Sequence, residues 1–275
     1  MIQVHTKLAT TLVYPVQLKT IDKLLADPRR RNEDNLATEP TVVDLVLNRD
    51  PKKRPKGATK MAFFGTANVD IFRNGEGGKI CAKQTYYILQ GDGPRAKQRM
   101  IAHDRATQLR NLSTETSCLV WASSLLSLVY AFIEKQLKRA GSPPPFDIPQ
   151  LRFIKAALAI EQNDKNDNNA FFLEEHINPD VEGPFRKYLN NDSAKPLALR
   201  DRADQERGEF LAFTQHVQYW KTQKLVFVSD YQGQLFLLLV TLANYGLCRG
   251  EHTFNRSPNH NRQVETSRLD QQVHN

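Results

Sequence analysis

The feature that most constrains the fold is a helical pattern that runs from about residue 94 to residue 140. Along its second half, apolar residues recur at intervals of three and four positions, at Leu125, Leu128, Val129, Phe132 and Leu137. This spacing places the side chains on one face of a helix, as a core helix requires. Gly141 and a run of prolines follow, and they should end the helix because proline cannot continue it. The sequence therefore predicts a long helix whose apolar face packs into a core.

Short strands are predicted on both sides of this helix. Runs of strand-forming residues lie near Val13 and Val43 and at residues 61–65, 79–89, 148–161, 170–173 and 225–228. A second helix is expected at residues 209–220, and the polar run 162–170 is expected to form a surface loop. Strands and helices alternate along the chain, which indicates a mixed α and β fold.

Composition narrows the class of protein. The 275 residues suffice for one large domain or two lobes, and 40% hydrophobic with 25% charged residues is ordinary for a soluble globular protein. No window approaches the roughly 18 apolar residues of a membrane span, and the start of the chain lacks the apolar core of a signal peptide. The three cysteines, Cys81, Cys118 and Cys248, are widely spaced and odd in number. We therefore expect a cytoplasmic protein with reduced thiols and no membrane partner.

The net charge of +8 favours acidic partners such as phosphates, nucleotides or nucleic acid. Basic clusters lie at residues 29–31 and 52–56. Each is expected to be a solvated loop, with a nuclear address or a nucleic-acid patch as the alternative. The charge alone does not choose among these partners.

One stretch places polar residues directly after a predicted strand. The apolar run 225–228 precedes Asp230, Gln232 and Gly233. A strand that ends in this way can hold polar groups rigidly at the mouth of a cleft. The alternative is an ordinary strand-to-turn junction, in which aspartate and glycine serve as turn formers.

Four groups of motifs, in their order along the chain, resemble the alpha-type protein kinase family, most closely its fungal members. They are CAKQTYY, LVWASSLLSLVY, FLEEHI with GPFRKYLNN, and AFTQH leading to SDYQG. A histidine lies roughly fourteen residues before the Asp-x-Gln-Gly motif, as in the family. The likeness covers roughly residues 57–233. It implies an α+β fold with two lobes, as in protein kinases, and an ATP cleft between them.

The resemblance also divides the chain. Residues 57–233 would form the kinase domain, with the N-lobe over about 57–172 and the C-lobe over about 173–233. Residues 1–56 would be a partly irregular extension, and residues 234–275 a divergent, disordered tail. The implied activity is that of a serine/threonine kinase, which transfers the γ-phosphoryl group of ATP, with magnesium, to a hydroxyl of a protein substrate.

The resemblance assigns several residues to the nucleotide. Lys83 matches the lysine that contacts the phosphates of ATP, and Glu174 matches the hinge glutamate beside the adenine. Gly57 and Lys60 look like the small glycine loop that places backbone N–H groups and a further cation over the phosphates. Glu115 lies on the long predicted helix, and we expect it to pair with Lys83.

Three further residues match the family's catalytic positions. Lys187 matches the loop lysine near the transferred phosphate. Asp230 matches the aspartate that would orient or deprotonate the acceptor hydroxyl, and Gln232 matches the glutamine that helps to hold magnesium.

His216 matches a histidine that ligates a structural zinc ion in the family. The remaining zinc ligands should be a histidine and two cysteines near the C-terminus, and a tetrahedral site needs all four donors. Only Cys248, His252 and His260 are candidates, and their spacing fits no zinc pattern. The zinc site is therefore expected to be incomplete.

The sequence leaves the family pattern after Gly233, where a second metal-binding aspartate and a glycine-rich loop would follow. Residues 235–242 are instead a bare apolar run. We expect an incomplete C-lobe, with lower stability than in relatives that keep their zinc. This departure gives an alternative function, a catalytically impaired pseudokinase that acts as a binding module. A nucleic-acid-binding protein is less favoured, because no recognised motif supports it.

Overall fold

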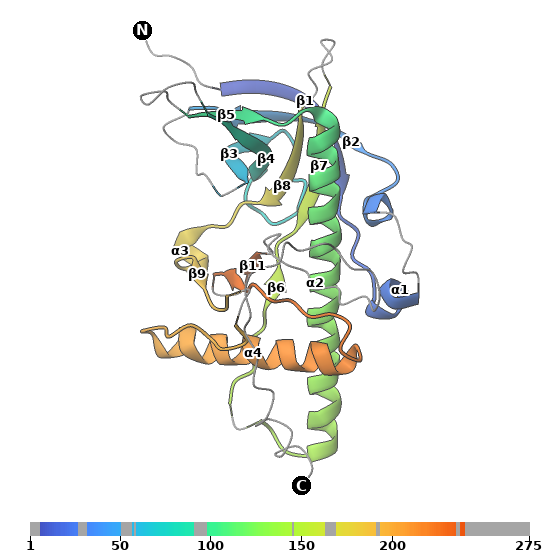
Figure 1. The fold of residues 1–275 in the computed structure, drawn as a ribbon, viewed down its shortest axis with the longest axis vertical. Coiled ribbons are helices and arrows are strands. Elements are labelled where there is room, and N and C mark those ends of the chain that lie inside the picture. The colour runs from blue at the N-terminus through green and yellow to red at the C-terminus, as the bar shows by residue number, and fades with distance from the viewer. Residues whose placement is uncertain are drawn as a thin grey trace.

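A computed structural model describes residues 6–26, 32–50, 57, 59–90, 98–144, 146–162, 169–190, 193–234 and 237–239. The fold is α+β, with a large sheet at one end of the molecule and a small sheet with a crossing helix toward the other (Figure 1). One long helix runs beside both.

The large sheet has seven strands in the order β3-β2-β1-β7-β8-β4-β5. They are β1 (Thr6–Pro15), β2 (Thr41–Asn48), β3 (Lys60–Ala67), β4 (Lys79–Leu89), β5 (Arg99–Ala102), β7 (Ala156–Glu161) and β8 (Ala170–Glu175). Neighbours in this order pair antiparallel. Because β3 also pairs with β4, six of the strands close into a ring and β5 lies outside it.

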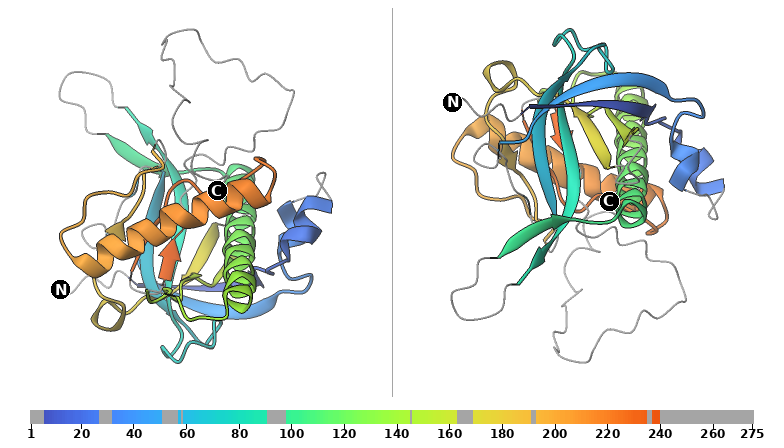
Figure 2. Two further views of the ribbon diagram at one scale, coloured as in Figure 1. Left: turned by 90° about the horizontal axis from the view of Figure 1, so that it is seen from below. Right: turned by 90° about the horizontal axis from the view of Figure 1, so that it is seen from above.

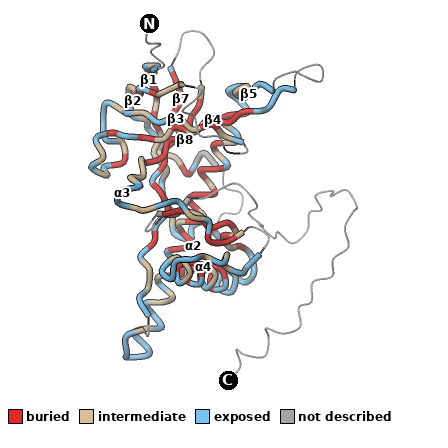
Figure 3. The backbone as a smooth tube through the Cα atoms, turned by 90° about the vertical axis from the view of Figure 1, so that its left-hand side faces the viewer, coloured by how far each residue is buried: buried red, intermediate tan, exposed pale blue. Residues whose placement is uncertain are grey.

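The interior of this ring is apolar. Alternate residues of a strand point to opposite faces, and the inward set of β2 is Val43, Leu45 and Leu47, which are at most 1% exposed. Phe63 of β3 and Phe171 of β8 meet edge to face in the same core. Figure 3 shows how buried backbone concentrates in these strands and in the long helix.

The long helix is α2 (Arg105–Ala140). Asp104 caps its start, where its carboxylate accepts a hydrogen bond from the Thr107 amide. Gly141 ends it with a left-handed backbone (φ 66°) and donates its N–H to the Leu137 carbonyl. By length and composition alone α2 could cross a membrane, but half of its most apolar window is buried inside the protein, as expected for a core helix.

The second half of the molecule is built on α2 and α4 (Arg202–Lys221), which cross each other (Figure 2). A small sheet in the order β6-β11-β10-β9 lies beside them. Its strands are β6 (Arg152–Phe153), β9 (Arg186–Lys187), β10 (Gln232–Gly233) and β11 (Leu237–Leu239). The short helices are α1 (Ile21–Ala26), the 3-10 turn η1 (Asn32–Asn35) and α3 (Pro179–Glu182).

Several predicted boundaries change. The long helix begins at Arg105 rather than near residue 94, because residues 99–102 pair with β4 as β5. The single strand predicted at 148–161 is two strands, β6 and β7, which join different sheets. The second helix extends back from 209 to Arg202, since Asp201 caps it through the Asp204 amide.

The strand predicted at residues 225–228 is wrong. These residues have no strand partner, and side chains of α4 and of its C-cap residue Thr222 bond their backbone instead. An apolar run does not show which groups will satisfy its backbone.

The ends of the chain also differ from the expected division. Residues 6–48, expected in an N-terminal extension, supply β1 and β2 to the large sheet. In the expected tail, residues 237–239 form β11, and residues 240–275 lie outside the described part of the chain.

We expect Leu125→Ala to destabilise the protein by about 2–5 kcal/mol, because Leu125 is fully buried on α2 and its truncation leaves a cavity. Leu8→Ala is the control, since Leu8 is 65% exposed on β1 and its truncation should change stability by less than about 0.5 kcal/mol. Denaturant unfolding of both variants measures the difference. Equal destabilisation would contradict the central place of α2 in the core.

Candidate functional site

Lys83 and Glu174 lie on neighbouring strands, β4 and β8. Glu174 stands opposite Cys81 in the strand register, which makes it the diagonal neighbour of Lys83 on the same face of the sheet. The Lys83 ammonium donates to Glu174 Oε1 at 2.6 Å, and the two side chains are 21% and 7% exposed. The pair is thus largely shielded from water.

A second pair lies beside the first. Lys60 on β3 donates to Glu115 on α2, and Glu115 is 2% exposed. The predicted pairing of Glu115 with Lys83 is therefore wrong. The pairing of β4 with β8 places Glu174 beside Lys83, whereas Lys60 bonds the Glu115 carboxylate on α2.

Charge and burial act together on this group, which we call the lysine cluster: Lys60, Lys83, Glu115 and Glu174. Burial alone would lower the pKa of Lys83, but the Glu174 carboxylate outweighs it and raises the pKa above its usual value. Glu115 adds to this rise, so it acts on Lys83 without bonding it. Cys81 lies among the same groups, and burial raises the pKa of its thiol to about 12.

Gly57 lies next to the backbone of Lys60, a member of the lysine cluster. Its backbone N–H donates to the Lys60 carbonyl at 2.9 Å, and its own carbonyl accepts from the Tyr86 hydroxyl at 2.7 Å. These two bonds join Gly57 to Lys60, the first residue of β3, and to Tyr86 on β4.

The predicted catalytic residues come together in the small sheet. Lys187 of β9 stands directly opposite Gln232 of β10 in the antiparallel register. The Lys187 ammonium lies 3.3 Å from Asp230 Oδ1. The side chain of Asp230 is only 8% exposed, while that of Lys187 is 41% exposed. The structure thus gathers one acid, one amide and one cation, which we call the Asp230 group.

A link that sequence reasoning missed anchors the end of β8, beside Glu174. Glu175 accepts from the Arg152 guanidinium and from the Lys155 amide, at 3.1 and 2.7 Å. Arg152 belongs to β6, so this contact ties the large sheet to the small one. Adjacent residues of a strand face opposite sides, so the consecutive pair Glu174 and Glu175 indicates that each carboxylate has a different partner. This was the signal in the sequence for the second contact.

His216 lies on the exposed side of α4. In the described part of the chain, no group of three or more histidine, cysteine or acidic side chains could hold a metal ion. The other predicted candidates, Cys248, His252 and His260, lie outside the described residues. The residues that can be placed therefore do not fit a zinc site.

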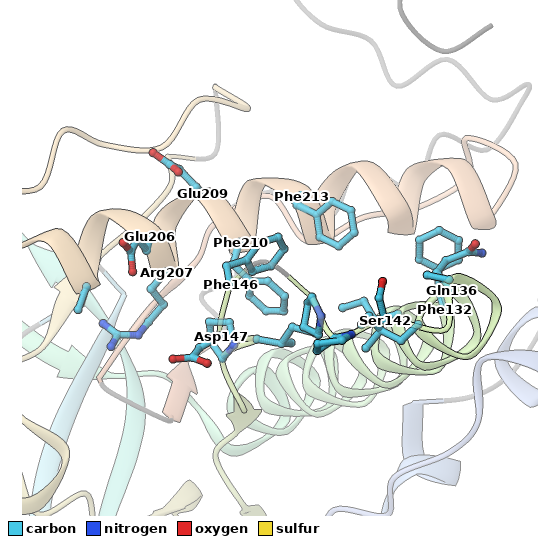
Figure 4. Close-up of a pocket in the computed structure, with 18 residues that line it drawn as sticks. Phe132, Gln136, Ser142, Phe146, Asp147, Glu206, Arg207, Glu209, Phe210 and Phe213 are labelled. Atoms are coloured by element: carbon cyan, nitrogen blue, oxygen red, sulfur yellow. The ribbon is translucent and has the colours of Figure 1, made fainter. Parts of the chain in front are cut away.

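An apolar cavity of about 880 Å³ lies elsewhere, between the end of α2, the proline-rich loop and α4. Four aromatic side chains line it, those of Phe132, Phe146, Phe210 and Phe213 (Figure 4). None of the predicted site residues lies in its wall.

The chain matches one protein family and a set of solved structures. The family model described as the alpha-kinase family matches residues 56–257. No curated protein sequence matches.

Solved structures of low identity match over most of the chain. An alpha kinase from Entamoeba histolytica is 15% identical, with 84% of this chain and 76% of that chain covered and a TM-score of 0.47. The apoenzyme alpha-kinase domain of myosin-II heavy chain kinase A is 13% identical, with 84% and 81% covered and a TM-score of 0.42. The ADP complex of the myosin heavy chain kinase A domain is 14% identical, with 84% and 80% covered and a TM-score of 0.42.

We expect Lys83→Met to destabilise the fold by about 3–5 kcal/mol, because it leaves the buried Glu174 carboxylate without its cation. The double variant Lys83→Met/Glu174→Leu should recover much of this loss, since it removes both charges. Lys79→Met is the surface control, as Lys79 is 54% exposed and its pair with Glu76 is worth about 0–1 kcal/mol. Denaturant unfolding tests all three, and a double variant no more stable than the single would argue against the pair.

We expect Cys81 to be nearly inert toward iodoacetamide in the folded protein. The thiolate is the reactive form, and at pH 9 a thiol with a pKa of about 12 is ionised in about one molecule in a thousand. In the unfolded chain, with the ordinary pKa of 9.0, about half is ionised at that pH. Because the pKa of this thiol is higher in the folded protein than in the unfolded chain, its ionisation lowers the free energy of unfolding progressively as the pH rises from 9 toward 12. Mass spectrometry of the Cys81 peptide, with and without guanidinium, measures the rates, and equal rates would contradict this environment.

Proposed function

The chain belongs to the alpha-kinase family, and from this premise we propose that it transfers the γ-phosphoryl group of Mg-ATP to a serine or threonine hydroxyl of a protein. The observation that carries the proposal is the Asp230 group, in which Asp230, Lys187 and Gln232 meet although more than 40 residues separate Lys187 from the other two in the sequence. Phosphoryl transfer is mainly a matter of positioning and charge, and this is what such a group can supply.

Each residue of the Asp230 group has a role in this proposal. The Asp230 carboxylate accepts a hydrogen bond from the acceptor hydroxyl and takes its proton as the new P–O bond forms and the bond from the γ-phosphorus to the bridging oxygen breaks, so that ADP leaves. The Lys187 ammonium, 3.3 Å from that carboxylate, stabilises negative charge on the transferred phosphoryl oxygens. Its 41% exposure leaves it accessible to a substrate.

The lysine cluster is proposed to hold the nucleotide. Lys83 and Lys60 would contact phosphate oxygens, and the backbone N–H groups near Gly57 would lie over them. Both ammonium groups are already paired with buried carboxylates, so a phosphate would have to share each lysine with its glutamate. The place of Glu174 beside an adenine remains part of the proposal.

Magnesium fits the donor chemistry of the Asp230 group. The side-chain amide oxygen of Gln232 is a hard oxygen ligand, and it would help to hold the ion together with phosphate oxygens and water. When bound, the ion neutralises charge on the phosphate oxygens. Zinc has no part in the proposal, because the described residues do not form its site.

A pseudokinase that binds a partner without transfer is the second candidate. The observation that favours it is the complete pairing of charge in the lysine cluster, which leaves Lys60 and Lys83 neutralised without a nucleotide. A cytoplasmic location remains a prediction for either candidate.

A phosphotransfer assay with labelled ATP, magnesium and a generic basic protein tests the proposal. We expect Asp230→Asn and Lys83→Ala each to lower the rate at least about 100-fold, because each removes a group that acts on the reacting atoms or the phosphates. Glu209→Gln, an exposed change on α4, should leave the rate unaltered. A wild-type protein that binds labelled ATP but transfers nothing would establish the pseudokinase instead.

A further inference from the structure

The segment 225–231, which carries Asp230, is held in an unusual way. It has no strand partner among the described residues, and Val226 and Val228 are nearly fully buried. A buried backbone must still satisfy its N–H and C=O groups. Side chains of α4 supply these bonds.

The bonds come from one stripe of α4. Gln215 and Gln218 lie on α4 and Thr222 is its C-cap residue, and their spacing of three and four residues places them along one side of the helix and its end. All three are at most 5% exposed. Buried polar side chains cost stability unless they are hydrogen-bonded. Each of these three bonds the backbone of the segment, although Gln215 Oε1 has no hydrogen-bond partner among the described residues.

Gln218 binds the segment at two points. Its Oε1 accepts from the Val228 amide at 2.9 Å, and its Nε2 donates to the Tyr231 hydroxyl at 2.9 Å. Gln215 Nε2 donates to the carbonyls of Val228 and Ser229, at 2.7 and 3.1 Å. The Gln218 side chain therefore accepts from one backbone N–H, and the Gln215 side chain donates to two backbone carbonyls. The backbone of a neighbouring strand would make bonds of the same kinds.

Tyr231 completes the arrangement on the other side of Asp230. Its carbonyl accepts from the amides of Tyr188 and Leu189, at 2.9 and 3.2 Å, which joins it to the strand that carries Lys187. Its fully buried hydroxyl lies 3.1 Å from Thr214 Oγ1 as well as bonding Gln218. The residues before and after Asp230 are thus fixed from two directions.

We infer that Gln215 and Gln218 are positioning residues that hold Asp230 against Lys187 and so set the rate of transfer. The inference rests on the proposed function. It assigns these glutamines no contact with substrate, since they act through the backbone of Val228 and Ser229 and through the Tyr231 hydroxyl.

The test compares Gln218→Met and Gln215→Met with Tyr130→Phe. Methionine keeps the length of glutamine but cannot donate or accept as the amide does. Tyr130→Phe is the control: it also deletes two hydrogen bonds, one to the Pro149 carbonyl and one from the Leu151 amide, and these partly buried bonds involve none of the residues 225–231. Tyr231→Phe is the milder variant to use should either methionine change prevent folding.

We expect the glutamine variants to lower kcat about 10- to 100-fold with KM for ATP nearly unchanged, because the lysine cluster is untouched. Backbone amide exchange in a peptide covering residues 225–231 should quicken in the same variants. Tyr130→Phe should change neither quantity, even at an equal loss of thermal stability. This split distinguishes positioning from a general weakening of the fold.

The inference is overturned if Gln218→Met matches Tyr130→Phe in kcat, or if the 225–231 peptide exchanges as in the wild type. A wild-type protein without phosphotransfer contradicts the proposed function instead. The exchange measurement still decides in that case whether the glutamines order the Asp230 segment.

Discussion

The two halves of the molecule depend on one helix, because α2 packs against the large sheet, the small sheet and α4. Its 36 residues span about 54 Å. Its first half places Glu115 in the lysine cluster, and its second half packs against α4, where Phe132 contacts Trp220 edge to face. A shift of this helix would therefore disturb both groups of functional residues at once.

The two groups differ in how they treat charge. In the lysine cluster each ammonium has its own carboxylate, and both carboxylates are nearly inaccessible to water. In the Asp230 group the carboxylate is buried but its cation remains partly in solvent. A ligand that binds the ammonium groups of the lysine cluster must therefore share them with buried carboxylates, whereas the ammonium of Lys187 is partly open to solvent.

The sequence was informative where a local rule decides the structure. Gly141 and the prolines after it fixed the end of α2, and alternation in residues 79–89 matched β4. It failed where the partner lies far along the chain. The sequence around Glu115 does not show that the pairing of β4 with β8 brings Lys83 to Glu174. Residues 225–228 do not show that glutamine side chains, rather than a neighbouring strand, bond their backbone. In the sequence, the buried polar stripe of Gln215, Gln218 and Thr222 is visible only as three polar residues at helical spacing.

The closed ring of strands has a practical consequence for where the chain can be cut. The match to the family begins at residue 56, yet β1 and β2 lie between β3 and β7 in the ring. A fragment that starts at the family boundary would lose both strands, and β3 and β7 would each expose an unpaired edge. The unit that folds therefore begins before the motifs do, and expression of the motif region alone would favour aggregation over a native sheet.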